Sequence, residues 1–124
     1  MKKIIYLSVL LCGGIYVSGQ KSYQQYKQER QYAQQYANEQ RQQFNNDVNK
    51  ALNQYNSLTN QYLTLVKKHK STTYVEKNYP KISKPMYDVQ IRLLSVGKSM
   101  TWSQSDKYNE IHHKWLEIQD LYGD

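Results

Sequence analysis

The side chains that could carry out chemistry in this sequence are three histidines and one cysteine. His112 and His113 are adjacent, and adjacent residues of a helix point about 100° apart, so they cannot hold one metal ion together. Glu110 and His113 form a Glu-x-x-His pair, but a di-iron helical bundle needs two such pairs and two further glutamates. The sequence has no second pair. We therefore predict neither a metal site nor a cofactor.

Motifs of the common catalytic families are also absent from the sequence. It contains no glycine-rich phosphate loop, no G-x-S-x-G and no H-E-x-x-H. Cys12 is the only cysteine, lies in an apolar segment, and has no histidine placed to form a nucleophilic pair with it. One cysteine also excludes an intramolecular disulfide. We predict that the protein is not an enzyme, so its function must come from the surfaces of its helices.

Composition and charge limit the architecture. The chain has 124 residues, which allows one small domain at most, and it is 39% hydrophobic. A small polar chain of this kind must gain stability from helix–helix packing or from a partner. Of the net charge of +7, residues 66–98 carry eight cations and two anions, and residues 99–124 carry two cations and five anions. The basic middle indicates either attraction to an anionic surface or a solvated loop, and the absence of a nucleic-acid-binding module argues against nucleic acid.

Residues 1–20 have the pattern of an export signal. Lys2 and Lys3 precede an uncharged run over residues 4–20. This pattern fits a signal peptide cleaved after Gly19, which leaves a periplasmic or secreted protein. It also fits an anchor in the inner membrane, with the rest of the chain facing the periplasm, because about 17 uncharged residues is the lower limit for crossing a bilayer. Both interpretations export the remainder of the chain.

Residues 21–70 predict one long coiled-coil-like helix, because Gln, Asn and Tyr dominate and Gly and Pro are absent. Apolar residues step by three and four, with a four-residue stutter between Phe44 and Val48. After the stutter the spacing is regular, and it predicts a parallel dimer or higher oligomer. Partial disorder of a Gln-rich segment is the alternative for the first half. The predicted seam consists of Val48, Ala51, Tyr55, Leu58, Tyr62 and Leu65.

Beyond the long helix the fold class remains all-α. Residues 71–85 read as a connector, because β-branched residues and two prolines favour extended or turn structure. Residues 86–124 predict a short helix over 86–96, ended by Gly97, and an amphipathic helix over 105–122 capped by Ser103 or Ser105. The last helix either folds back on the chain or binds a partner. Its apolar face consists of Tyr108, Ile111, Trp115, Ile118 and Tyr122.

The order of these parts, and the stretch GGIYVSGQKSYQQYKQERQ in particular, resembles the inner-membrane spanins of double-stranded DNA phages. The resemblance covers most of the chain as architecture: an N-terminal membrane segment, a long periplasmic helix, a connector and a C-terminal helical region. It implies lysis of the host, with the C-terminal region pairing with a small outer-membrane lipoprotein. The alternative is a cleaved, soluble helical protein that acts as a chaperone, an inhibitor or a subunit of an envelope assembly.

Overall fold

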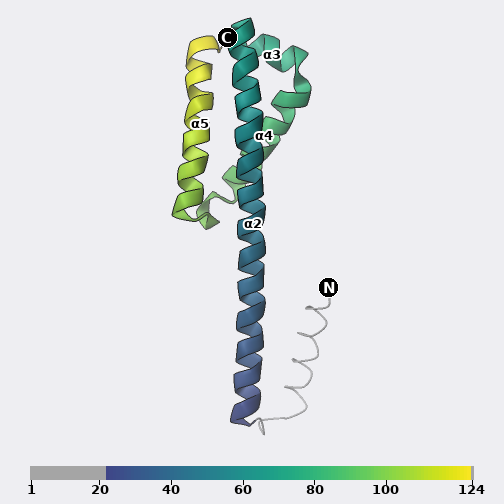
Figure 1. Ribbon diagram of the computed structural model, residues 1–124, viewed down its shortest axis with the longest axis vertical. Helices are drawn as coiled ribbons and strands as arrows, with labels where there is room; N and C mark the ends of the chain where they lie inside the picture. Colours follow the sequence, from purple (N-terminus) through teal and green to yellow (C-terminus); the bar gives the residue numbers. More distant parts are fainter. Residues whose placement is uncertain (1–21, 124) are drawn as a thin grey trace. The chain divides into compact units, whose positions relative to one another are not determined.

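The computed structural model describes residues 22–123 (Figure 1). All regular structure in this range is helical, with no strand. This confirms the all-α class for the described residues. None of the described helices is long and apolar enough to cross a bilayer. The predicted signal or anchor over residues 4–20 lies outside the described residues. The helices are α2 (Tyr23–His69), α3 (Thr72–Asn78), α4 (Pro80–Ser95), the 3-10 helix η1 (Gly97–Ser99) and α5 (Trp102–Tyr122).

The chain divides into two compact units between Phe44 and Asn45, which is within the predicted four-residue stutter. In the first unit, the described residues form the first half of α2, and none of them is buried. This helix begins with a capping box. The Ser22 hydroxyl accepts from the Gln25 backbone N–H at 3.3 Å, and the Gln25 side chain accepts from the Ser22 N–H at 3.1 Å.

The second unit, residues 45–123, is a three-helix bundle formed by the second half of α2 with α4 and α5 (Figure 1). Hydrogen bonds define the directions of its helices. Gln104 bonds Asn49 and Gln119 bonds Tyr62, so α5 runs parallel to α2. The backbone reverses direction in α4, which runs antiparallel to α2. The short helix α3 contacts both α4 and α5.

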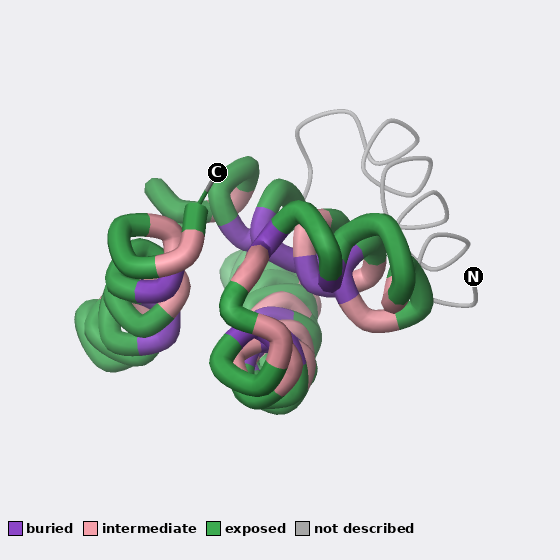
Figure 2. The backbone as a smooth tube through the Cα atoms, turned by 90° about the horizontal axis from the view of Figure 1, so that it is seen from above, coloured by how far each residue is buried: buried purple, intermediate pink, exposed green. Residues whose placement is uncertain are grey.

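The buried residues of the second unit lie on the faces of the three long helices that are turned toward one another (Figure 2). On α2 they follow a 4-3-4-3-4 spacing, which is the spacing of a helix face packed against neighbours. The buried apolar set is Val48, Leu52, Tyr55, Tyr62, Val66, Val75, Met86, Val89, Leu93, Tyr108, Ile111 and Ile118.

The predicted connector over residues 71–85 is instead mostly helical. The Ser71 hydroxyl accepts from the Tyr74 backbone N–H at 3.1 Å and so caps α3. Pro80 occupies the first position of α4, where its missing N–H costs nothing. Pro85 lies inside α4 and removes one intrahelical hydrogen bond. The sequence interpretation treated both prolines as breakers, whereas one starts a helix and packing tolerates the other.

Two predicted helix boundaries also differ. Helix α5 begins at Trp102, three residues before the predicted start, because Thr101 forms a full capping box with Gln104. Helix α4 begins before the predicted residue 86 and ends at Ser95. The long helix ends at His69, within one residue of its predicted end. Lys70 then reverses the backbone in the left-handed region, with φ of 57°, at a position where glycine is usual.

Candidate functional site

The predicted seam of α2 lies largely inside the chain's own bundle. Val48, Tyr55 and Tyr62 are buried, while its other three members are half-buried at the flank. The rest of the buried stripe consists of Leu52, Thr59 and Val66. Self-association through the seam stays a prediction. A second copy could contact the three buried side chains only if α4 or α5 moved away from α2. The flanking seam residues are Ala51, Leu58 and Leu65.

The predicted partner face of α5 also packs within the bundle. Tyr108, Ile111 and Ile118 are buried, and Trp115 and Tyr122 are half-buried. Of the two alternatives left open by the sequence, the structure has the helix folded back on its own chain. The Tyr122 carbonyl accepts a hydrogen bond from the Thr72 hydroxyl at 3.4 Å, which joins the end of α5 to α3.

A buried polar triad joins the three long helices. The Gln90 amide of α4 donates to the Tyr55 hydroxyl of α2 at 2.9 Å and lies 3.1 Å from His112 Nδ1 of α5. The Tyr55 hydroxyl lies 3.2 Å from the same nitrogen. Because Nδ1 faces two donors, the arrangement requires a neutral His112 whose Nδ1 accepts. We call Tyr55, Gln90 and His112 the core triad.

The ionisation of the core triad is suppressed by its surroundings. Burial raises the pKa of Tyr55 to about 12, despite the opposing hydrogen bond from Gln90. Burial also lowers the pKa of His112, and the neighbouring His113 adds a smaller lowering by charge repulsion. Both groups are therefore held in their uncharged forms at neutral pH. Neither pKa is shifted toward 7, as would be expected for a group that transfers protons at neutral pH. The core triad therefore has the properties of a structural contact between helices.

A second polar cluster lies further along α2. The Gln119 amide donates to the Tyr62 hydroxyl at 3.2 Å, and the Tyr87 hydroxyl donates to the Glu76 carboxylate at 2.6 Å. Burial raises the pKa of Tyr62 and, more strongly, that of Tyr87, which the bond to Glu76 raises further. The protonated phenol is thus the stable form, and Tyr87 acts as a donor that connects α4 to α3.

Aromatic rings join the two polar clusters into one continuous core. Ring centroids are 5.6 Å apart for Tyr55 and Tyr108, 5.4 Å for Tyr108 and His112, and 5.3 Å for His112 and Trp115. Trp115 then meets Tyr87 edge-on at 6.1 Å. Such ring pairs contribute roughly 0.5–1.5 kcal/mol each beyond the area they bury. Within the second unit, these rings pack beside a mainly aliphatic core that includes Leu52, Val89 and Leu93.

Trp102 does not join this aromatic core. It is 88% exposed at the start of α5. Hydropathy did not reveal the contributions of Gln90, Gln119 and His112, because each is polar. A usable signal was present for the two glutamines, since each lies on the same helix face as buried apolar neighbours.

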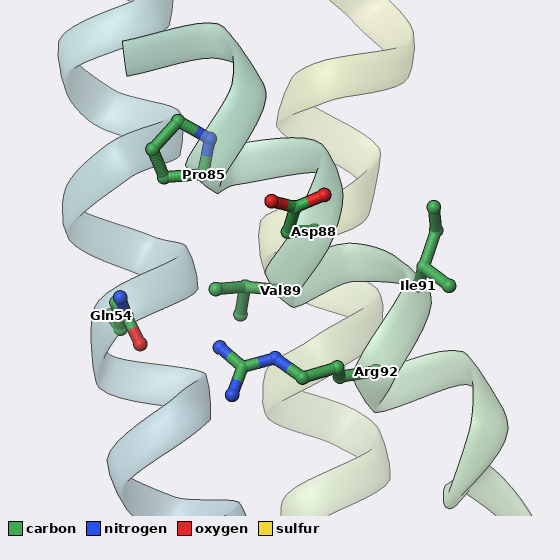
Figure 3. A pocket seen from close by; sticks show the side chains of 6 residues that line it. All are labelled: Gln54, Pro85, Asp88, Val89, Ile91 and Arg92. Atoms are coloured by element: carbon green, nitrogen blue, oxygen red, sulfur yellow. The ribbon is translucent and has the colours of Figure 1, made fainter. Parts of the chain in front are cut away.

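An open groove lies between α2 and α4 in the second unit (Figure 3). Val89 and the Arg92 guanidinium point toward α2, while Ile91 points away from it. The groove has a volume of about 560 Å³. Its guanidinium, carboxylate and amide could bind a small polar group, but it holds no nucleophile paired with a base. The lining residues are Gln54, Pro85, Asp88, Val89, Ile91 and Arg92.

Within residues 22–123, no three His, Cys, Asp or Glu side chains are placed to hold a metal ion. His113 is exposed on α5, one residue from the core triad. Comparison of the chain with protein-family models, with curated proteins and with solved structures finds no match.

Proposed function

We propose that this chain is an exported, membrane-tethered helical protein that acts by binding, most specifically as a spanin-like lysis subunit at the inner membrane. The observation that supports a binding role is that the polar side chains of the core are hydrogen-bonded to one another. His112, Gln90, Gln119, Tyr55 and Tyr62 form hydrogen bonds within the bundle, while the large apolar side chains exposed on the unit are scattered over its helices. We infer that such a unit acts by binding other molecules.

The tether in this proposal is the segment over residues 4–20, with Lys2 and Lys3 on the cytoplasmic side. Helix α2 follows it and carries the chain into the bundle. In the spanin-like form, the exported bundle engages a small outer-membrane lipoprotein, and the pair brings two membranes together during lysis.

The decisive experiment is to sequence the N-terminus of the exported protein and to separate membrane and soluble fractions. We expect a membrane-bound chain that retains residues 4–20. A soluble chain that begins at Gln20 would overturn the tether and favour the second candidate, a cleaved periplasmic or secreted binding protein. The second candidate is supported by the sequence Val17-Ser18-Gly19, which fits a signal-peptide cleavage site.

A second experiment addresses the spanin-like form alone. We expect the adjacent or overlapping reading frame to encode a short proline-rich lipoprotein, and we expect deletion of either gene to block lysis at the last step. Normal lysis by a deletion strain would refute the lysis role. The membrane tether is tested separately, by the N-terminal sequencing of the exported protein.

A further inference from the structure

One end of the second unit carries a cluster of lysines. The last turn of α2, the short helix α3 and the first turns of α4 meet at this end (Figure 1). All six lysines in this region are exposed. We call this cluster the basic end, and it consists of Lys67, Lys68, Lys70, Lys77, Lys81 and Lys84.

The basic end has little neutralising charge of its own. Between residues 67 and 84 the sequence has one acid, Glu76, whose carboxylate already accepts the Tyr87 hydroxyl at 2.6 Å. Among residues 22–123, no side-chain hydrogen bond or salt bridge engages any of the six lysines. Glu117 and Asp120 are exposed on the last turns of α5, whose end is bonded to α3 through Thr72 and Tyr122, so the six lysines outnumber the nearby described acids by two to one. The positive charge on the α2–α3–α4 side is therefore available to an anionic partner.

An aromatic ring is held within the basic end. Tyr74 of α3 is 45% exposed, and its ring lies against that of His69 at a centroid distance of 4.4 Å, with the ring planes tilted by 33°. Tyr79 also contacts His69, with ring centroids 5.7 Å apart and the Tyr79 hydroxyl 3.4 Å from His69 Nε2. A partly exposed tyrosine among lysines is typical of protein surfaces at the membrane–water boundary, where the ring is apolar and the hydroxyl stays wet.

We propose that the basic end docks on a bilayer surface rich in anionic phospholipid. The cluster contains lysine and no arginine. Lysines are compact, strongly hydrated point charges that suit a diffuse anionic surface, whereas recognition of nucleic-acid or free phosphate groups favours the planar fork of arginine. Each lysine near such a surface raises the affinity by about fivefold. The proposal goes beyond the proposed function and does not require the tether.

The test measures binding of the full chain to vesicles. The chain is held in neutral phosphatidylcholine nanodiscs, or used directly if it proves soluble, and is mixed with vesicles with or without a quarter of phosphatidylglycerol. Co-flotation gives the affinity. We expect binding to the anionic vesicles alone. We also expect its loss between about 0.1 M and about 1 M salt, because the screening length falls from about 10 Å to about 3 Å.

Two variants of equal charge change separate the basic end from general basicity. The variant K67Q/K68Q/K77Q/K81Q should bind anionic vesicles roughly 600-fold more weakly, because each lysine contributes a factor of about five. The matched control K27Q/K50Q/K98Q/K114Q removes four exposed lysines elsewhere and should change binding by less than about fivefold. The corresponding K-to-R variant of the basic end should retain binding. If circular dichroism shows that the quadruple variant is unfolded, the single variants K77Q and K81Q are tested instead. Each should bind anionic vesicles about fivefold more weakly.

Equal losses in the two quadruple variants would overturn the proposal, as would equal binding to neutral and anionic vesicles. Tighter binding of double-stranded DNA than of anionic vesicles at the same salt would assign the basic end to nucleic acid. If the chain proves to be soluble and untethered, its vesicle binding can still be measured directly, so the lipid-binding test does not depend on the tether. Failure of lipid binding likewise leaves the N-terminal sequencing intact.

Discussion

Acidification should destabilise the second unit through His112 of the core triad. The neutral imidazole accepts at Nδ1 in the fold, and burial holds the pKa of His112 below its ordinary value. Between that folded value and the unfolded value of about 6.5, the unfolded state binds more protons than the folded state. The free energy of unfolding therefore falls as the pH drops through about 6.5 toward the folded pKa of His112. The stabilisation that depends on neutral His112 is complete above about pH 6.5.

The size of the effect follows from the contacts that Nδ1 makes. Protonation removes its ability to accept from Gln90 or Tyr55, at 3.1 and 3.2 Å, and one lost hydrogen bond costs about 0.5–1.5 kcal/mol. Partial exposure of the ring keeps the loss toward the lower part of this range. For a domain of this size, each kcal/mol lowers Tm by roughly 4–8 °C. The fall in Tm on acidification is measured by thermal unfolding, followed by circular dichroism at a series of pH values.

The variants His112→Gln and His113→Gln form the matched pair for this test. Glutamine at 112 removes the titrating group, so the fall in Tm below pH 6.5 should largely disappear. Glutamine at 113, an exposed neighbour, should leave most of the fall in place. If the wild type and His112→Gln have the same pH dependence of Tm, the assignment of the acid sensitivity to the core triad is refuted.

Three further substitutions test the packing and the helix ends by Tm or by denaturant unfolding. Thr59→Val should stabilise the fold by about 1 kcal/mol, because the Thr59 hydroxyl is fully buried with no hydrogen-bond partner in the described residues; a loss of stability would imply an unseen partner. Lys70→Gly should add about 0.5–1 kcal/mol by relieving the left-handed φ of 57°, and no gain would contradict that strain. Thr101→Ala should cost about 1 kcal/mol by removing the α5 capping box, whereas an unchanged Tm would mean that the cap is redundant.

Much of the helical architecture was predictable because its determinants are local. The long helix ends at His69, within one residue of its predicted end, since Lys67 and Lys68 suit the negative end of the helix dipole and β-branched residues follow. The connector was not predictable in the same way. Proline acts as a breaker inside a helix but as a starter at its first position, and only the position of Pro80 relative to the helix distinguishes the two.

The candidate site was harder to predict because its residues act across helices. The predicted seam and the observed stripe share Val48, Tyr55 and Tyr62. Periodicity identifies a face of a helix but not what covers it. Whether α5 or a second copy covers α2 depends on how α4 turns the chain back, which no local pattern specifies. The role of Gln90 depends on partners 35 and 22 residues away in sequence.

The polar core has a consequence for how uniquely this bundle is specified. A core of leucines alone would let α4 and α5 slide along α2 at little cost, because apolar contacts are not directional. Here a shift of one helical turn would separate Gln90 from Tyr55 and leave buried donors unpaired, at about 1–3 kcal/mol for each group. The same shift would break the bond between Gln119 and Tyr62. The buried tyrosines thus add apolar area to a mainly aliphatic core and also fix the register of the three helices.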